Sequence, residues 1–338
     1  MSITEQPSST APVAMTAPTV AVVIPCFRVR QHILQLITEI GPEISRIFVV
    51  DDCCPEHSGD LVEASCADPR VSVLRHEINQ GVGGAVLTGY RAALAAGCDI
   101  MVKLDGDGQM DPALLPYFID PIARGDADYT KGNRFYDFDE LGRMPAIRIF
   151  GNAGLSILNK FSSGYWSIFD PTNGYTAIHA KVAARLPTHK ISKRYFFESD
   201  MLFRLNTLRA VVMDIPMHAK YEDEQSNLRI GKVLPEFFVK HLKNSFKRIF
   251  YNYFVRDASI ASIELVVGSF LLCFGLGVGL SDWIVSIRNQ VLASAGTVML
   301  AALPILVGIN LLLSFLNYDI RNQPTRAIHK LLPARPPQ

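Results

Sequence analysis

The sequence predicts an α/β fold, in which a mainly parallel sheet carries helices on both faces, followed by a C-terminal hairpin of two transmembrane helices. Two observations support this prediction. Short apolar segments rich in β-branched residues alternate with segments of helical periodicity between residues 19 and 130, and two long apolar runs lie near the C-terminus. Apolar strands that alternate with helices are typical of parallel sheets buried on both faces.

The elements follow one another in the order that such a sheet requires. The expected strands cover residues 19–25, 46–51, 71–75, 99–105 and 126–130. The expected helices cover residues 30–40, 61–66 and 83–96. Ligands of open α/β sheets bind beyond the carboxyl ends of the strands, so the polar residues that follow the strands are the first candidates for a site.

The composition excludes some classes of protein. The 338 residues include 33 Lys and Arg against 32 Asp and Glu, and 49% are hydrophobic. Low net charge with this hydrophobic content argues against disorder, and the lack of basic excess argues against a nucleic-acid partner. Residues 1–18 are rich in Ser, Thr, Ala and Pro, which predicts a disordered leader and not a signal peptide. The six cysteines show no CxxC spacing, and this suits a reducing cytoplasm.

Carboxylates follow the fourth expected strand. Asp105 and Asp107 flank a glycine there, and alternate residues of an extended segment point the same way. Two such carboxylates favour a hard-oxygen site for Mg²⁺ or Mn²⁺, which can neutralise the charge of a leaving diphosphate. A calcium loop is excluded because its sixth and twelfth positions would be Met110 and Pro116. A turn of solvated acids is the structural alternative.

Other polar residues at the same edge leave two interpretations open. Asp51 and Asp52 follow the second strand, where a carboxylate can bind a base or a ribose or can cap the next helix. Residues 79–84 (NQGVGG) resemble a phosphate-binding turn before a helix, although a close-packed turn explains them equally well. Several basic residues come later and favour a second anion site, namely Lys131, Arg134, Arg148 and Arg229.

The segment before the apolar runs predicts an amphipathic helix over residues 232–258. Aromatic and apolar residues recur there at helical spacing: Phe237, Phe238, Leu242, Phe246, Ile249, Phe250 and Tyr253. Basic residues occupy the positions between them: Lys240, Lys243, Lys247 and Arg248. This pattern favours a helix that lies in the headgroup plane of a membrane. A helix packed on the soluble domain is the alternative.

The two apolar runs predict a transmembrane hairpin within residues 259–318. They cover residues 260–280 and 291–315, and each is long enough to cross a bilayer. Basic residues precede the first run and follow the second, in a tail over residues 319–338, whereas the connecting residues 281–290 hold one Asp and one Arg. The positive-inside rule therefore places both termini and the domain over residues 19–231 in the cytoplasm. Two buried core helices are the alternative.

Taken together, six segments resemble the family 2 glycosyltransferases of GT-A fold, a Rossmann-like architecture. They are VVIPCF (22–27), VVDDCCPEHSGD (49–60), NQGVGGAVLTGY (79–90), KLDGDGQMDP (103–112), KGNRF (131–135) and DPTNGYTAIH (170–179). The order and spacing are similar to those of the polyprenyl-phosphate branch, which includes dolichol-phosphate mannose synthases and bacterial undecaprenyl-phosphate glucosyltransferases. The QxxRW signature of processive synthases is absent.

The resemblance implies a role for each matching residue. The nucleotide-binding residues would be Pro25, Phe27, Asp51, Asp52, Gly83, Asp105 and Gln109. The metal would lie on Asp105 and Asp107, with Gln109 beside them. The catalytic residues would be Asp107, Arg134, Arg148, Glu198 and Asp200, and the acceptor phosphate would meet Lys131, Arg148 and Arg229. The turn with Asp170, Asn173 and Gly174 would lie by the sugar. Phe27 stands where a Tyr is frequent, so a hydroxyl contact to the base is lost.

We therefore expect a membrane-bound hexosyltransferase, in a bacterial inner membrane. It would move a sugar from a UDP- or GDP-sugar to a polyprenyl phosphate by a single inverting displacement assisted by Mg²⁺ or Mn²⁺. Helical hairpins of this kind often associate, so a homo-oligomer is compatible with the sequence. A protein or soluble glycan as acceptor, and a membrane scaffold with a degenerate transferase fold, are the alternatives.

Overall fold

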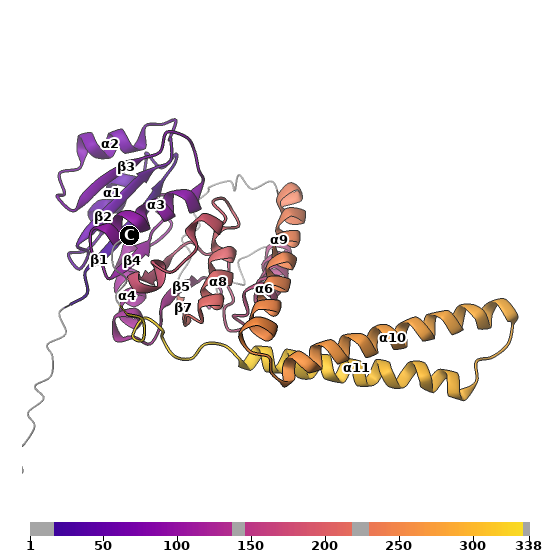
Figure 1. Cartoon of the computed structure of the whole chain (residues 1–338). Helices are drawn as coiled ribbons and strands as arrows, with labels where there is room; N and C mark the ends of the chain where they lie inside the picture. Colours follow the sequence, from indigo (N-terminus) through magenta and orange to yellow (C-terminus); the bar gives the residue numbers. More distant parts are fainter. Residues whose placement is uncertain (1–16, 137–145, 218–229, 334–338) are drawn as a thin grey trace, which may run out of the picture.

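The computed structural model describes residues 17–136, 146–217 and 230–333. Within them, a seven-stranded sheet forms the centre of an α/β domain, and a long helical hairpin projects from this domain (Figure 1). The fold class predicted from the sequence is confirmed.

The sheet has the strand order β3-β2-β1-β4-β6-β5-β7. Its strands are β1 (Val20–Cys26), β2 (Arg46–Asp51), β3 (Val71–Arg75), β4 (Ile100–Lys103), β5 (Tyr129–Asn133), β6 (Thr176–His179) and β7 (Val212–Pro216). Only β6 runs antiparallel to its neighbours, β4 and β5, among the pairings of the described strands. Strands β6 and β7 were not expected from the sequence, because each lacks a long β-branched run.

Helices cover both faces of the sheet. One face packs against α1 (Ile33–Glu39), α2 (Ser58–Ser65) and α4 (Leu115–Arg124), and the other against α3 (Val82–Ala95) and α8 (Phe197–Leu208). Alternate residues of β1 supply the two cores, since Val22 and Ile24 face the first layer while Ala21 and Val23 face the second. Short helical segments complete the domain: η1 (Pro112–Leu114), α7 (Ala180–Ala183) and η2 (Thr188–Lys190).

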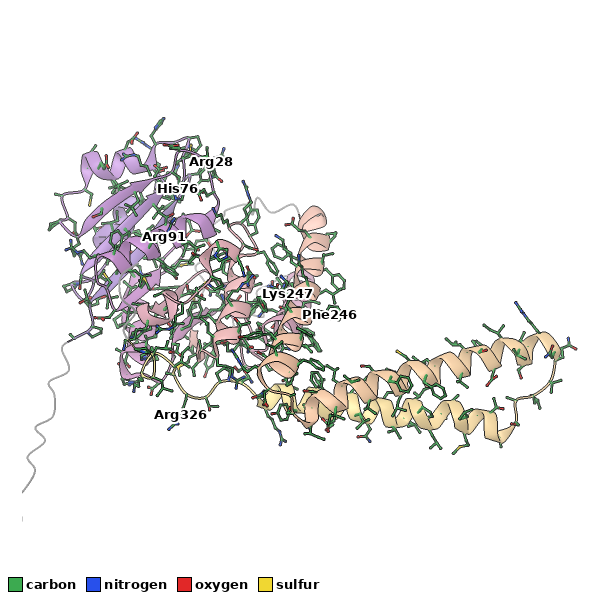
Figure 2. All side chains as sticks on the ribbon, viewed as in Figure 1. Arg28, His76, Arg91, Phe246, Lys247 and Arg326 are labelled. Atoms are coloured by element: carbon green, nitrogen blue, oxygen red, sulfur yellow. The ribbon has the colours of Figure 1, made fainter. Side chains whose placement is uncertain are left out.

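Helix α9 (Ile230–Phe250), continued by a π-helix (Tyr251–Arg256), packs against α6 (Ala146–Ser163) with its polar side. The buried side chains include His241, Asn244, Arg248 and Asn252. The outward side is apolar: Phe238, Leu242, Phe246, Phe250 and Phe254 are all exposed. Figure 2 shows Phe246 pointing away from the domain. This helix therefore buries its polar side and exposes its apolar side, which is the reverse of a surface helix in a water-soluble protein.

Three residues of this helix differ from their expected places. Arg248 was expected on the solvated basic face, but it is only 2% exposed and forms an ion pair with Asp319. Phe237 and Tyr253 were expected on the outer apolar face, but both are buried. The helical period is as predicted. The buried face differs from the expectation, because it also includes polar residues that contact polar groups of the domain.

The hairpin consists of α10 (Ile260–Asn289) and α11 (Ala295–Arg321), two helices long and apolar enough to span a membrane. Residues 281–289 were expected in the connection, but they continue α10, and the helix ends where Gln290 adopts a left-handed conformation (φ 53°). Ser294 then caps α11 through the N–H of Thr297. The two helices approach closely at Gly268, Gly275 and Gly308.

Beyond α11 the chain returns to the α/β domain, and we call residues 322–333 the C-terminal strap. In Figure 1 the strap runs from the base of the hairpin along the domain towards α4. Ile328 and Leu332 pack against the core on the α3 and α8 side, and His329 is buried. The tail expected from the sequence is thus docked along most of its length.

Candidate active site

The polar residues that follow β1, β2 and β4 lie at one edge of the sheet, because the carboxyl ends of neighbouring parallel strands point to the same edge. Pro25 is buried at the end of β1, whereas Phe27 is 41% exposed, with the guanidinium of Arg28 5.5 Å from its ring centroid. Figure 2 labels Arg28 and His76 in this part of the domain. An exposed aromatic ring beside a cation at this edge suits the stacking of a nucleoside base.

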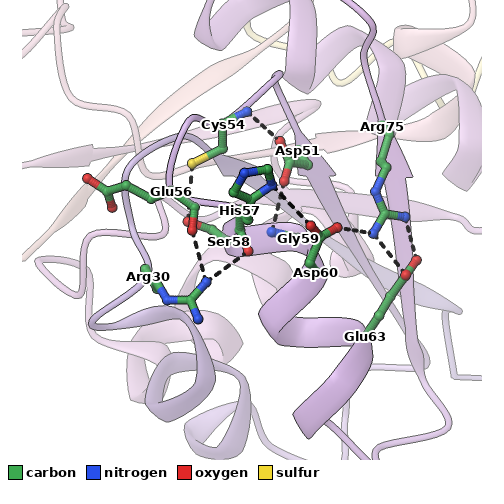
Figure 3. A network of polar contacts seen from close by, with 10 residues as sticks. All are labelled: Arg30, Asp51, Cys54, Glu56, His57, Ser58, Gly59, Asp60, Glu63 and Arg75. Carbon is green, nitrogen blue, oxygen red and sulfur yellow. Dashed lines mark hydrogen bonds and ion pairs between the residues drawn. The ribbon is translucent and has the colours of Figure 1, made fainter.

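The carboxylate of Asp51 organises the loop after β2 (Figure 3). Its Oδ1 accepts the N–H of Cys54 at 2.7 Å, and its Oδ2 accepts the N–H of Gly59 at 2.8 Å. A Cβ atom at Gly59 would lie 2.5 Å from Oδ2, so the close approach of α2 requires glycine. The capping interpretation of Asp51 therefore describes its contacts, and the carboxylate fixes the loop between β2 and α2.

Asp52 organises the glycine-rich turn in a similar way. Its carboxylate accepts the N–H groups of Gln80 at 2.8 Å and Gly81 at 2.7 Å, and it contacts Nδ1 of His76 at 2.7 Å. The N–H of Gly83 donates to the carbonyl of Lys193 at 2.9 Å. The turn is thus close-packed, and the N–H of Gly83 has a protein partner.

Asp105 lies two residues beyond the end of β4 and is held by a buried lysine. The Nζ atom of Lys103 is 2.8 Å from Oδ1 of Asp105, 3.4 Å from Oε1 of Glu198 and 3.0 Å from the carbonyl oxygen of Gly174. Burial acts to lower the pKa of Lys103, but the two carboxylates outweigh it and raise the pKa above its ordinary value. The two carboxylates therefore favour the charged form of Lys103 beneath the strand end.

The residues at this edge fit a hard divalent cation. Asp105 and Asp107 are both partly exposed, and Asp107 also accepts the N–H of Gln109 at 3.0 Å. No cluster of three or more His, Cys, Asp or Glu that could hold a metal occurs in the part of the chain that the structure describes. Mg²⁺ is commonly held by one or two carboxylates together with the phosphates of a substrate, and this donor set matches that mode.

Lys131 is the second buried lysine of the site. It lies in one row across the sheet with Lys103, Thr176 and Asp214. Burial lowers the pKa of Lys131 to about 8, and burial raises the pKa of Asp214 to about 6. The Nζ atom of Lys131 donates to the carbonyl oxygen of Asn173. Lys131 was expected at the acceptor phosphate, but its side chain is fully buried and supports the 170–174 turn.

Arg134 and Asp170 hold the other end of that turn. The guanidinium makes two hydrogen bonds to the carboxylate, from Nε at 2.8 Å and from Nη2 at 3.0 Å. Burial acts to raise the pKa of Asp170, but Arg134 outweighs it and holds the pKa below its ordinary value. The Asn173 side chain accepts the N–H of Tyr175 at 2.9 Å. The 170–174 turn before β6 is therefore anchored at one end by the Arg134–Asp170 pair and at the other by the hydrogen bond from Lys131 to Asn173.

The structure separates the acidic pair on α8. Glu198 faces Lys103, whereas Asp200 accepts the N–H of Ser192 at 2.9 Å and the amide of Asn244 at 3.1 Å. Asp200 therefore links α8 to α9 and lies apart from the Lys103 cluster. Residues two apart on a helix point in different directions, which explains the separation.

Two of the expected basic residues lie beyond the described side chains. Arg229 is outside the described residues, and Arg148 lies in the first turn of α6, where the described structure is limited to the backbone. Sequence reasoning also missed Lys103 and Asp214. A single lysine at the end of an otherwise apolar strand is a usable signal for Lys103, since a buried charge needs partners. Asp214 carries no comparable signal, because β7 itself was not predicted.

Much of the α/β domain is similar in sequence to known proteins. Residues 21–186 match the model of glycosyl transferase family 2. The undecaprenyl-phosphate mannosyltransferase of Micrococcus luteus is 31% identical over 175 residues, which are 51% of this chain and 71% of that protein. The UDP-N-acetylglucosamine–dolichyl-phosphate N-acetylglucosaminyltransferase of Methanococcus voltae is 31% identical over 166 residues, which are 48% of this chain and 66% of that protein.

A solved structure shares the architecture of the domain. The glucosyl-3-phosphoglycerate synthase of Mycobacterium tuberculosis, solved with Mn²⁺, UDP-glucose and phosphoglyceric acid, matches with a TM-score of 0.51 at 17% identity. The match covers 68% of this chain and 79% of that one. At this identity the likeness shows the fold alone, which is of GT-A type. On the sequence matches, the chain belongs to glycosyl transferase family 2.

Proposed function

We propose that this glycosyltransferase moves a hexose from a UDP- or GDP-sugar to a polyprenyl phosphate. The observation that carries the proposal is the combination of two partly exposed carboxylates, Asp105 and Asp107, with an outward apolar helix and a two-helix hairpin in one chain. The carboxylate edge suits a water-soluble nucleotide donor, whereas the apolar surfaces suit an acceptor that is held in a bilayer. The relatives whose names specify undecaprenyl or dolichyl phosphate support the acceptor class.

The reaction in this proposal is one inverting displacement. An oxygen of the acceptor phosphate forms a bond to the anomeric carbon while the bond between that carbon and the donor diphosphate breaks. The second pKa of a phosphate ester is about 6, so the attacking oxygen is largely ionised at neutral pH and needs no general base. Catalysis then depends on positioning and on charge stabilisation of the leaving diphosphate.

The residues of the chain divide this work between them. Asp105, Asp107 and Gln109 would hold Mg²⁺ or Mn²⁺, which neutralises charge on a leaving diphosphate. Lys103 holds Asp105 in place, and Lys131 holds the turn beside it. Glu198 completes the charge balance of Lys103, and Arg148 and Arg229 remain the candidates for the acceptor phosphate. Phe27 would supply the exposed ring on which a base stacks, and the buried Pro25 precedes it in β1.

The location in this proposal is a bilayer, as in a bacterial inner membrane, with the catalytic domain and both flanks of the hairpin in the cytoplasm. The basic residues that flank α10 and α11 support this orientation. The outward phenylalanines of α9 support contact of that helix with the headgroup region. The donor site would then lie near the depth at which a lipid phosphate is presented.

The test measures transfer from a panel of radiolabelled UDP- and GDP-sugars in membranes that contain the full-length protein and undecaprenyl phosphate. We expect the label in an organic-soluble glycosyl phosphate, and we expect Asp107→Asn to reduce it by about 100-fold or more without lowering the melting temperature. Asp120→Asn is the matched control, because Asp120 is an exposed carboxylate on α4 that pairs with Arg124.

Three results would contradict the proposal. Label in protein or in a water-soluble glycan would favour the other acceptor classes. Absence of transfer from every donor would favour a scaffold. Full activity of Asp107→Asn would refute the role of that carboxylate.

A further inference from the structure

The carboxylate of Asp319, near the end of α11, is the meeting point of several elements. It is 4% exposed and accepts hydrogen bonds from Nη1 of Arg248 at 2.6 Å, Tyr253 Oη at 2.6 Å and Nε1 of Trp166 at 2.9 Å. These donors come from α9, from the π-helix and from the segment after α6. We call Asp319, Arg248, Tyr253 and Trp166 the Asp319 cluster. The Asp319 carboxylate thereby joins α11 of the hairpin to α9, to the π-helix and to the segment after α6.

Arg248 extends this cluster into the domain. Its Nε and Nη2 atoms donate to the carbonyl oxygen of Phe161, at 3.1 Å and 2.9 Å. Gly164 has a positive φ of 76°, and a Cβ atom there would lie 2.8 Å from Nη1 of Arg248. The guanidinium therefore occupies a closely fitted place between α6 and α11. Charge-assisted hydrogen bonds from several donors to one carboxylate add geometric specificity to the contact between these elements.

The C-terminal strap supplies a second attachment. The carbonyl oxygen of Asn322 accepts a hydrogen bond from Nη1 of Arg209 at 2.7 Å. Further along, the buried carboxylate of Asp128 accepts the N–H of Ile328 at 2.9 Å, the N–H of His329 at 2.9 Å and, at 2.7 Å, a contact from Nδ1 of His329. The His329 ring also stacks on His179, with centroids 4.1 Å apart. The strap is thus bound to the end of α8, through Arg209, and to residues of the β5 and β6 region, through Asp128 and His179.

We propose that the Asp319 cluster and the strap together hold the active site at a fixed height and tilt above the membrane hairpin. One attachment would leave the domain free to rotate about it, whereas a second attachment elsewhere on the domain removes that freedom. The inference rests on the proposed function, because the depth of a lipid phosphate is set by the bilayer. Small misplacements of reacting groups reduce rates strongly, so these residues act as positioning residues for a membrane-held acceptor.

The test compares two acceptors with the same full-length protein in lipid nanodiscs. One acceptor is undecaprenyl phosphate in the bilayer, and the other is citronellyl phosphate, a ten-carbon analogue supplied in solution. For Asp319→Asn and for Asp128→Asn we expect kcat/KM for undecaprenyl phosphate to fall at least about tenfold. For citronellyl phosphate, and for binding of the nucleotide-sugar, we expect a change of less than about twofold, because the site itself is intact.

Matched controls come from the same elements. Glu264→Gln changes a carboxylate of the hairpin whose partner is the hydroxyl of Ser314. Asp126→Asn changes an exposed carboxylate two residues from Asp128 that pairs with Arg124. Both controls should keep wild-type activity on both acceptors.

A second design avoids substitutions in buried charges. A protease site is inserted at the exposed residues Thr325 and Arg326, and the folded, purified protein is cut there. We expect cutting to lower transfer to undecaprenyl phosphate while transfer to citronellyl phosphate persists.

The outcomes separate the possible explanations. Equal losses on both acceptors would overturn the inference in favour of a purely structural role, and unchanged transfer to undecaprenyl phosphate would overturn it directly. A wild-type protein that uses neither acceptor would overturn the proposed function, and this inference with it.

Discussion

Gly174 lies against the two charged side chains at the end of β4, Lys103 and Asp105. A Cβ atom at this position would lie 2.3 Å from Oδ2 of Asp105 and 2.4 Å from Nζ of Lys103. Because the position has no side chain, the 170–174 turn can rest against the carboxylate while its carbonyl oxygen accepts a hydrogen bond from Lys103. The geometry of Asp105 therefore depends on a glycine that is 69 residues away in sequence (174 minus 105).

Gly174→Ala should displace the Lys103–Asp105 pair and reduce kcat/KM for glycosyl transfer by about 100-fold, since positioning errors of about 1 Å have effects of that size. Gly151→Ala is the matched control. Gly151 lies in α6, where an added Cβ atom would have nothing within 4 Å, and alanine favours a helix over glycine. Steady-state kinetics and melting temperatures of both variants check this, and wild-type rates for Gly174→Ala would contradict it.

The residues of the site differ in how far the sequence predicts them. Asp105 and Asp107 can be found because a carboxylate after a buried apolar strand must lie at the ligand edge of a parallel sheet. The contacts of Asp51 and Asp52 cannot be found in this way. Their partners are backbone N–H groups up to 29 residues away, and these depend on how the loops fold. The burial of Lys131 likewise depends on β6 and β7, which the sequence did not reveal.

At the scale of elements, α9 shows the limit of reading periodicity. The i, i+4 series of aromatic and apolar residues predicts a helix with an apolar face, and that helix is present. The period is the same whether the apolar face or the polar face is buried. Which face is buried depends on partners elsewhere in the chain, because Arg248 forms an ion pair with Asp319 and His241 forms a hydrogen bond with Ser162. Phe238, Leu242 and Phe246 are left to line an apolar groove with Leu158 and Phe161 of α6.

We expect the double substitution Phe246→Ser and Phe250→Ser to weaken transfer to a bilayer acceptor without changing the melting temperature in detergent. The two side chains are 68% and 63% exposed, so the folded domain loses little by their removal. Phe237→Ser is the control for loss of a buried side chain. Phe237 is 9% exposed, so its replacement should destabilise the protein by about 3 kcal/mol or more. Differential scanning fluorimetry and liposome flotation distinguish the two, and a lower melting temperature for the double variant would contradict the outward role.

At the scale of the whole molecule, the α/β domain and the apolar hairpin are joined through buried polar contacts. The sequence predicts the division into these two parts, because hydrophobic length alone identifies α10 and α11. It does not predict their attachment, since Asp319 resembles any polar residue at the end of a span. Within the hairpin, close approach depends on glycines of both helices, notably Gly268 and Gly308.

Gly308→Leu should force the two helices apart. A Cβ atom at Gly308 would lie 2.7 Å from the backbone nitrogen of Leu272 and 2.8 Å from the carbonyl oxygen of Gly268. Backbone atoms cannot move away as a flexible side chain can, so we expect a lower melting temperature and weaker transfer to a bilayer acceptor. Gly277→Leu is the control, with nothing within 4 Å of its Cβ position. Similar melting temperatures for the two variants would contradict the close packing at Gly308.

The strap also has a consequence for the order in which the chain is completed during synthesis. Asp128 leaves the ribosome 200 residues ahead of Ile328, and both hairpin helices are made between them. Until residues 328 and 329 emerge, Asp128 has the N–H of Val211 but lacks the three contacts of the strap. A carboxylate buried without partners is costly. The domain therefore reaches its final stability last of all, after the segments that would enter a bilayer have been made.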